Sequence, residues 1–401
     1  MADAMTFGEL MRSLMREQGL SLRGLARKAH CNHGHLSKIS RDQCAPSEDY
    51  AKHLDKILKA NGRLSALVPK KAKVTYKQGA ESNAWTVAPI SDSGQLRAAR
   101  DMGIMEAFRA ADRQIGGGRL YPTVVNYLNT AIGPRLFGGT DDYSDRTVFA
   151  CAGAMTEMAG WMAYDGGRGT IARQHFERSL KLASAGNDFQ LKAQIYASMS
   201  HLYLHMGKPD RAIQLAQTGQ VVLKRNPVPS LSARLLAMEA RGLADHNEPT
   251  ACMKALVRAE RTLSKESANT ISPWLSPFDE ASLASEAARS MLRTSQLPNA
   301  ETRARMVIRM RSETHTRSRA FGQLLLVAAL IAQDELEEAC IEAARVLSVA
   351  DSLSSSLVVE QLQAIRESLL PHRSFAPVAM FLDKAHDPLR GWMPTYRTHL
   401  T

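Results

Sequence analysis

Apolar side chains near the start of the chain recur every three or four residues, the spacing of short amphipathic helices. One helix is predicted from Ser21 to Ala29, because Ser21 is a favourable N-cap residue and apolar side chains follow it on one face. Asn32 can cap a second short helix in the same way. These two helices, joined by a tight turn at His30-Cys31, predict a helix-turn-helix.

Two further helices are predicted around this motif. An amphipathic helix ahead of it ends at Gly19, a residue type common after helix C-termini. Behind it, Pro46-Ser47 begins another helix that ends near Gly62. Residues 1–68 are therefore expected to form a small five-helix domain, because four or five short helices can close a single core.

Beyond residue 96 the pattern is almost wholly helical, and it repeats. Three copies align at intervals of 40 residues, with Ala172, Ala212 and Cys252 at equivalent positions and a Gly or Asn five residues before each. A further copy aligns on Ala339, 87 residues on, which leaves room for one degenerate copy. Each unit is a helix, a turn and a second helix, so stacked helix pairs are predicted.

Residues 69–95 are polar and basic at their start, without a sustained helical period, which is typical of a linker. The predicted domains are a helix-turn-helix domain in residues 1–68, this linker, and a helical repeat domain in residues 96–401. The predicted fold class is all-α, a five-helix domain followed by an α-solenoid of helix pairs.

Several residue groups in residues 5–68 fall at the spacing of a known family, namely Gly19-Leu20-Ser21, Leu25-Ala26, His35-Leu36-Ser37-Lys38-Ile39 and Pro46-Ser47. These residues resemble the DNA-binding domain of phage repressors, Cro and the bacterial regulators built on it. Two positions depart from the family. Leu22 stands where a Gln commonly contacts the DNA backbone, and Ser40 stands where Glu is frequent.

In that family the second helix of the motif lies in the major groove, and its N-terminal side chains meet base edges. The resemblance implies base contacts by His33, Gly34, Ser37 and Lys38, of which Lys38 can bond guanine O6 or N7. It implies phosphate contacts, which set the register, by Asn32, Arg23 and Arg41. For any single one of these residues, an ordinary solvated surface is the alternative.

The positive charge of the chain lies mostly near its N-terminus. Residues 1–75 hold 14 Lys and Arg against 7 Asp and Glu, a net charge of +7, while the whole chain carries +11. The rest of the chain therefore carries only the difference, +4. A basic head on a near-neutral body is the charge distribution expected of a DNA-binding protein.

The helical units resemble tetratricopeptide repeats, although their period is longer than is usual in that family. Such arrays form a concave face, lined by the first helix of each unit, that binds peptides or protein segments. In this register the concave face is expected to carry Trp161, Tyr164, Gln194, His201, His205, Arg234 and Arg241. These groups would suit a peptide, its carboxylate or an aromatic metabolite. A pure scaffold that holds a dimer together, or plain surface, is the alternative.

Composition and motifs narrow the class of protein further. The five cysteines are scattered without a C-x-x-C pair, which is typical of buried thiols in a reducing cytoplasm. The longest apolar run, Leu324 to Ala332, is too short to span a bilayer, and no secretory leader is recognised at the start. No catalytic motif is present, and the group His30-Cys31-His33-His35 diverges around its turn. We therefore expect a cytoplasmic protein without membrane association, enzymatic activity, metal or other cofactor.

Taken together, these features predict a transcriptional regulator that binds double-stranded DNA. The segment around Gly116-Gly117-Gly118, together with Pro273-Trp274-Leu275 and Phe278-Asp279-Glu280, resembles the body of actinobacterial regulators that join this head to helical repeats. A homodimer is expected to bind an inverted repeat, and the repeats are expected to bind a small peptide or, second, a hydrophobic metabolite that changes operator binding. The alternative is a DNA-tethered adaptor whose repeats recruit another protein.

Overall fold

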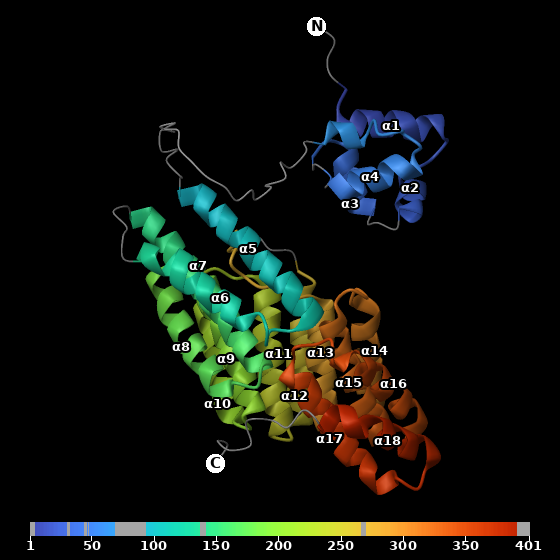
Figure 1. Ribbon diagram of the computed structural model, residues 1–401. Coiled ribbons are helices and arrows are strands. Elements are labelled where there is room, and N and C mark those ends of the chain that lie inside the picture. The colour runs from blue at the N-terminus through green and yellow to red at the C-terminus, as the bar shows by residue number, and fades with distance from the viewer. Residues whose placement is uncertain are drawn as a thin grey trace, which may run out of the picture. The chain divides into compact units, whose positions relative to one another are not determined.

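The regular elements of the described residues are all helical, which confirms the predicted all-α fold class (Figure 1). The computed structural model describes residues 5–29, 33–43, 46, 48–68, 94–136, 142–265 and 270–390. Contacts divide the chain into two compact units, residues 1–87 and 88–401. The expected turn His30-Cys31, the expected cap Asn32 and most of the expected linker lie outside the described residues.

The described residues of the first unit form four α-helices and one 3-10 helix around a single apolar core. Their bounds are α1 Phe7–Glu17, α2 Leu22–Lys28, α3 His33–Ser40, α4 Glu48–Ile57 and η1 Ser65–Leu67. Thr6 and Glu9 form a capping box at the start of α1, in which each side chain accepts the other residue's backbone N–H. At the start of α2, the Ser21 hydroxyl accepts the Gly24 N–H at 3.1 Å, the contact expected of an N-cap.

The second unit begins with four elements that stand outside the repeat and continues with six helix pairs (Figure 1). The first elements are α5 Gly94–Ile115, α6 Tyr121–Tyr127, the π-helical turn η2 Leu128–Ile132 and the 3-10 turn η3 Gly133–Leu136. The pairs are α7 Asp142–Asp165 with α8 Gly169–Ala185, α9 Phe189–His205 with α10 Pro209–Leu223, α11 Pro229–Asp245 with α12 Pro249–Leu263, α13 Glu280–Arg293 with α14 Leu297–Met310, α15 Thr316–Ala332 with α16 Leu336–Ala350, and α17 Ser356–Leu369 with α18 Ala376–Arg390, with the 3-10 turn η4 Leu370–His372 inside the last pair. No helix of the described residues combines the length and the apolar content that crossing a membrane requires.

A left-handed residue separates the two helices in each of the first five pairs. Gly167, Gly207, Asn247, Ser295 and Asp334 occupy this position, with φ between 57° and 74°. Five residues later a small side chain is fully buried in every case: Ala172, Ala212, Cys252, Ala300 and Ala339. The left-handed residue lets the chain reverse, and the small one lets the paired helices approach closely. The degenerate copy for which the sequence left room is the pair α13 and α14.

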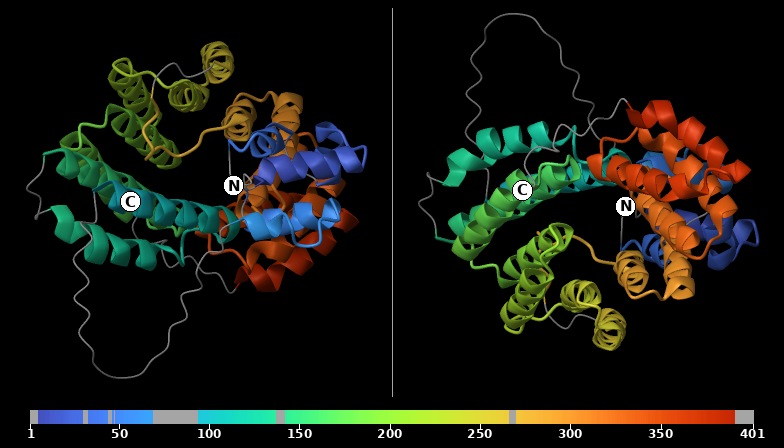
Figure 2. Two further views of the ribbon diagram at one scale, coloured as in Figure 1. Left: turned by 90° about the horizontal axis from the view of Figure 1, so that it is seen from above. Right: turned by 90° about the horizontal axis from the view of Figure 1, so that it is seen from below.

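The first helices of the pairs contact one another in order, so that α7, α9, α11, α13, α15 and α17 form a continuous inner row. Figure 2 shows the pairs following one another along a curve. The helix α5 contacts both α7 and α15, and it therefore links the beginning of the row to its fifth pair. The curve of helix pairs is closed by this contact rather than left open.

The carboxylate of Asp165, at the end of α7, is the centre of this closure. It accepts the N–H of Gly117 at 2.9 Å, the hydroxyl of Ser355 at 2.6 Å and two N–H groups of Arg317 at 2.7 and 3.1 Å. These donors come from the turn after α5, the residue before α17, and α15. One fully buried carboxylate thus joins three segments that are far apart in the sequence.

The glycines of the turn after α5 allow this close approach. A Cβ atom on Gly117 would lie 2.6 Å from the Cα of Met162, and one on Gly118 would lie 2.8 Å from the carbonyl oxygen of Ser354. The N–H of Gly118 donates to that same carbonyl at 2.9 Å. A larger residue would push the turn away from α7 and from the segment before α17.

Residues 270–279, which we call the strap, cross from α12 towards α13 and lie against α9 and α5. The Gln190 side chain donates to the Thr270 carbonyl at 2.9 Å and accepts the Ser272 N–H at 2.6 Å. The guanidinium of Arg109, on α5, donates to the Trp274 carbonyl at 3.0 Å. The strap explains why the fourth repeat starts late, since the interval from Cys252 to Ala300 is longer than the intervals between the earlier copies.

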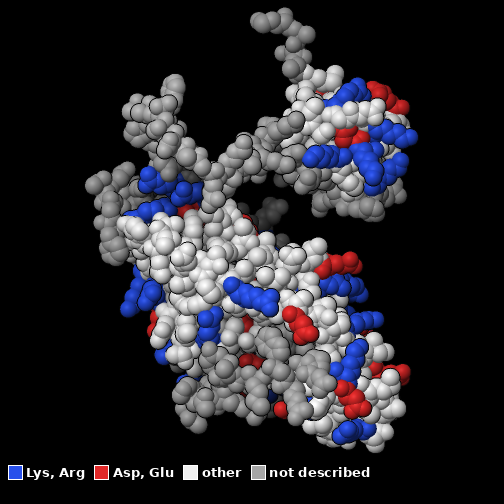
Figure 3. All heavy atoms as spheres, in the orientation of Figure 1, with Lys and Arg blue, Asp and Glu red and all other residues white. Residues whose placement is uncertain are grey.

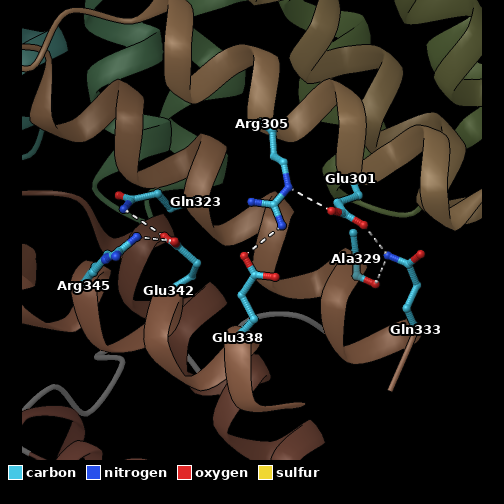
Figure 4. A network of polar contacts seen from close by, with 8 residues as sticks. All are labelled: Glu301, Arg305, Gln323, Ala329, Gln333, Glu338, Glu342 and Arg345. Carbon is cyan, nitrogen blue, oxygen red and sulfur yellow. Dashed lines mark hydrogen bonds and ion pairs between the residues drawn. The ribbon is translucent and has the colours of Figure 1, made fainter. Parts of the chain in front are cut away.

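The last pairs are also connected by polar contacts on their outer side (Figure 4). Arg305 of α14 forms ion pairs with Glu301 and with Glu338 of α16, both at 2.8 Å. Gln333 donates to the other oxygen of Glu301 at 2.9 Å. These groups are partly exposed, so each pair contributes about 0–1 kcal/mol. Arg305 is thus an arginine whose charge is matched by a carboxylate on each of two sides.

Replacing Asp165 with Ala is expected to destabilise the second unit by about 3–5 kcal/mol, because Arg317 would stay buried with less compensation. Thermal unfolding of the full chain measures this loss. Asp383→Ala is the matched control, since Asp383 is 73% exposed and lies 3.7 Å from Arg373 at the surface. Equal melting temperatures for the two variants would contradict the closing role of Asp165.

Candidate ligand cavity and DNA-binding surface

The closed curve of helices surrounds a cavity of about 530 Å³ within the second unit. Its wall consists of the inner helices, the facing part of α5, and the end of the strap. The volume falls within the range of roughly 300–1,000 Å³ that is usual for small-molecule sites. The inner row, rather than the second helices of the pairs, therefore provides the concave surface.

The lining is dominated by arginine. It contains seven arginines, three histidines and four carboxylates among the described residues. The arginines are Arg109 and Arg113 from α5, Arg234 and Arg241 from α11, Arg289 from α13, Arg311 just after α14, and Arg317 from α15. The carboxylates are Asp112, Glu157, Asp279 and Glu286.

Six of the seven residues that the repeat register placed on the concave face line this one cavity: Trp161, Tyr164, His201, His205, Arg234 and Arg241. They come from α7, α9 and α11, and the rings of Trp161 and His201 lie 5.0 Å apart in an edge arrangement. The Trp161 Nε1–H donates to the Ser198 hydroxyl at 3.1 Å. The structure thus brings together side chains from three repeats.

Gln194 departs from that expectation, because it is fully buried and does not line the cavity. Its amide nitrogen donates to Glu157 at 2.5 Å, and its carbonyl oxygen accepts the Ser276 N–H at 2.6 Å. The strap covers Gln194 and forms a hydrogen bond with its side-chain amide. Gln194 therefore holds the strap on α9 rather than facing a ligand.

Ion pairs with carboxylates neutralise three of the lining arginines, and a fourth, Arg109, pairs with the exposed Glu106. Arg311 binds both oxygens of Asp279, at 2.6 and 2.9 Å. Arg241 pairs with Glu286 at 3.0 Å. Arg317 pairs with Asp165 and, at 3.3 Å, with Asp112. Burial lowers the pKa of Arg317, but the two carboxylates outweigh it and raise that pKa, so this arginine stays charged.

Arg113, Arg234 and Arg289 form no ion pair with any described carboxylate. Within the described part of the chain, Arg234 has one hydrogen bond, to the Ser198 hydroxyl at 3.2 Å, and Arg289 has none. The buried Nε atoms of Arg113 and Arg109 also lack a described partner. Burial is the largest cause that lowers the pKa of both Arg234 and Arg289, and the neighbouring Arg241 lowers that of Arg289 further. Glu157 and Glu286 act in the opposite direction on Arg234, as does Glu286 on Arg289. Since guanidinium groups keep their proton, these charges are held at a cost in stability.

His201 is neutral in this setting. Burial is the largest cause that lowers its pKa well below 6.5, followed by Arg241, Arg289, Arg234 and His205. Its Nδ1 lies 3.1 Å from the Arg241 guanidinium, which can only donate, so Nδ1 accepts and Nε2 carries the hydrogen. Burial likewise raises the pKa of the Tyr164 hydroxyl to about 12, which keeps it protonated.

Sequence reasoning missed five arginines of the lining and the glutamate that pairs with Arg241. For Arg289 a signal was present. His201, Arg241 and Arg289 all stand six residues before the left-handed residue of their pair, as does Trp161. The fourth copy was too degenerate to align, so its inner helix was not used. Arg109 and Arg113 precede the repeats, and no sequence periodicity predicts them.

In the first unit, α3 places three of its predicted DNA-contacting positions on one side. Leu36 and Ile39 are fully buried in the core, and residues 34, 37 and 38 lie on the opposite side of the helical register. The Arg41 guanidinium donates to the Ser37 hydroxyl at 2.9 Å. Arg23, on α2, is exposed. The side chains of His33, Gly34 and Lys38, and the whole of Asn32, lie outside the described part.

The exposed surface of the first unit is basic. Lys and Arg gather on its visible face in Figure 3, whereas blue and red patches alternate on the second unit. Exposed basic residues include Arg12, Arg16, Arg23, Lys28 and Arg41. The guanidinium of Arg12 donates to the Ser40 carbonyl and so holds the end of α3 against α1. Positive charge beside an anchored helix suits a phosphate backbone.

No protein-family model and no curated protein matches the chain. Among solved structures, it is similar to Bacillus thuringiensis PlcR in complex with the peptide PapR7 and DNA. That similarity covers 79% of this chain and 99% of the other, at 12% identity and a TM-score of 0.38. A likeness of this size transfers neither ligand nor function.

Lowering the pH from 7.5 to 5.5 is expected to destabilise the second unit, with His201 as one cause. Its folded pKa lies below 6.5, so the unfolded chain binds a proton more readily, and stability present above pH 6.5 is lost as the pH falls below it. One histidine accounts for up to about 1.4 kcal/mol per pH unit. Melting temperatures across this range measure the slope. His201→Gln should reduce it, and an unchanged slope would contradict this assignment.

Proposed function

We propose that this protein is a sequence-specific DNA-binding transcriptional regulator whose repeat unit binds a signal that controls operator binding. The observation that carries the proposal is the cavity lined by the inner helices, in which three partly buried arginines form no ion pair with a described carboxylate. Buried charges without partners lower stability, and proteins keep such groups mainly where a function requires them.

The DNA-binding part of the proposal is supported by the first unit. The helix α3 is anchored in the core by Leu36 and Ile39, and its opposite side carries the positions that the family resemblance assigns to base contact. Ser37 and Lys38 would contact base edges in the major groove, while Arg23 and Arg41 would contact phosphates. His33, Gly34 and Asn32 complete the proposed surface.

Two copies of the chain would bind together. A helix-turn-helix head covers only a few base pairs, so a homodimer is proposed to bind an inverted repeat with half-sites about 34 Å apart, one helical turn. Signal binding in the repeat unit would change operator affinity by favouring one of two arrangements of the protein.

The signal is proposed to be a small peptide or another small molecule. The cavity supports this over the adaptor alternative, because its polar groups lie in a recess between α5, the inner helices and the strap. A recruited protein would need an open surface of roughly 800 Å² on each partner. The groups that lack partners lie inside instead.

Selection of genomic DNA fragments by the purified full chain tests the DNA-binding part. A short inverted repeat is expected to be enriched at physiological salt. The double variant Ser37→Ala, Lys38→Ala should lose the enrichment, because each good base contact contributes about 1–3 kcal/mol of discrimination.

Lys56→Ala is the control for this experiment, since Lys56 is an exposed lysine at the end of α4, on another helix. It should retain the enriched motif and lose at most a small, sequence-independent part of the affinity. If the wild-type chain enriches no motif, or if the double variant enriches the same motif equally well, the proposed function is wrong.

A further inference from the structure

The lining of the cavity carries more positive than negative charge. Seven arginines face four carboxylates in the lining, a net charge of +3. Asp165 and Glu106 do not line the cavity, but each pairs with a lining arginine, Arg317 and Arg109. With these two carboxylates included, the net charge is still positive, at +1. The histidines do not change this balance near neutral pH, because burial lowers the pKa of His201 and of His205.

The uncompensated positive charge lies on the lining arginines that form no ion pair. Arg241, Arg311 and Arg317 are paired, whereas Arg113, Arg234 and Arg289 are not paired with any described carboxylate. Elsewhere in the unit an arginine such as Arg305 reaches two carboxylates, as Figure 4 shows. Three of the seven lining arginines thus have no ion pair among the described residues.

The unpartnered groups are also all hydrogen-bond donors. A guanidinium has five N–H groups and no acceptor, and the buried Nε atoms of Arg109 and Arg113 face no acceptor among the described residues. A ligand that satisfies them must supply acceptor oxygens. An uncharged apolar ligand would leave these donors unpaired, and a cation would be repelled.

The cavity has an apolar part as well. Met158, Trp161, Met162, Phe321 and Leu357 share its lining with the arginines. An inorganic anion alone would leave these side chains without contact. A volume of about 530 Å³ accommodates a metabolite-sized molecule that combines an apolar body with charged groups.

From these observations we infer that the cavity binds a small organic anion with at least two negative charges, and that Arg234 and Arg289 hold its charged groups. The inference rests on the proposed function and narrows its signal to one chemical class. Phosphate monoesters and dicarboxylates share this chemistry, because both offer oxygens in the paired geometry that guanidinium groups bind best.

Four probes with the same aromatic ring and different charge test the inference. Phenyl phosphate and phthalate are dianions, benzyl alcohol is neutral and benzylamine is a cation. Their binding to the purified full chain is measured by titration calorimetry at one salt concentration. At least one dianion is expected to bind at least tenfold more tightly than benzyl alcohol, and benzylamine is expected not to bind. The tighter of the two dianions identifies phosphate or carboxylate as the preferred group.

Arg289→Gln and Arg293→Gln form a matched pair of variants on α13. Arg289 lines the cavity, whereas Arg293, one turn later, is 67% exposed and pairs with Asp245 at 2.9 Å. Arg289→Gln should weaken dianion binding about tenfold or more, because a charge-assisted hydrogen bond is lost. Arg293→Gln should leave it unchanged.

The same two variants separate a ligand-binding role from a structural one. If the role of Arg289 is to bind an anion, Arg289→Gln removes a partly buried charge without an ion pair and raises the melting temperature of the unliganded chain. If Arg289 is structural, the variant lowers that temperature. A lower melting temperature than in Arg293→Gln would therefore overturn the assignment of Arg289.

The inference is overturned if neither dianion binds at millimolar concentration, or if benzyl alcohol or benzylamine binds as tightly as the dianions. Wild-type affinity in Arg289→Gln would also overturn it. Failure of the proposed function is a separate result, because it appears as loss of the enriched DNA motif in the selection experiment. An enriched motif without dianion binding would reject this ligand class alone.

Discussion

The buried carboxylate of Asp165 is the contact on which the second unit depends. A row of helix pairs would by itself be an open curve, since each pair packs only on its neighbours. Asp165 joins the turn after α5 to α15 and to the start of α17, and Gly117 makes room for this approach. Without that closure α5 would not face α11 and α13. The concave surface would remain a groove instead of becoming a cavity.

The closing contact of Asp165 also affects the charge of the cavity lining. Asp165 and Asp112 neutralise Arg317, so the arginine nearest to the closing contact is compensated. Farther from it, Arg234 and Arg289 are partly buried and form no ion pair, although Glu157 and Glu286 act on Arg234, and Glu286 on Arg289, from a distance. Proteins rarely bury charge without a direct partner. The fold therefore combines a stable closing contact with a destabilised interior. A dianion that entered would stabilise the closed form, and in this way binding and shape would be linked.

Much of this arrangement follows from the sequence. The left-handed residue and the buried small residue five positions later predicted the pairs, and the same register brought Trp161, His201 and Arg241 into one lining. Arg289 occupies the equivalent position, but the strap lengthens the interval before its repeat and hides the match. The contributions of α5 could not be predicted, because they depend on a contact between Asp165 and residues up to 190 positions away. The burial of Gln194 could not be predicted for the same reason, because its strap partner Ser276 lies 82 residues farther along the chain.

The central claim is that an anion in the cavity controls the DNA-binding head. It is tested most directly by the affinity of the full chain for its selected operator, measured by fluorescence anisotropy at fixed salt with and without saturating dianion. The account predicts that affinity changes about fivefold or more in either direction, the usual size of coupling between two sites. Arg289→Gln should show no such change at the same dianion concentration. Identical operator affinity with the cavity empty and filled, in a wild-type chain that binds the dianion, would contradict the account.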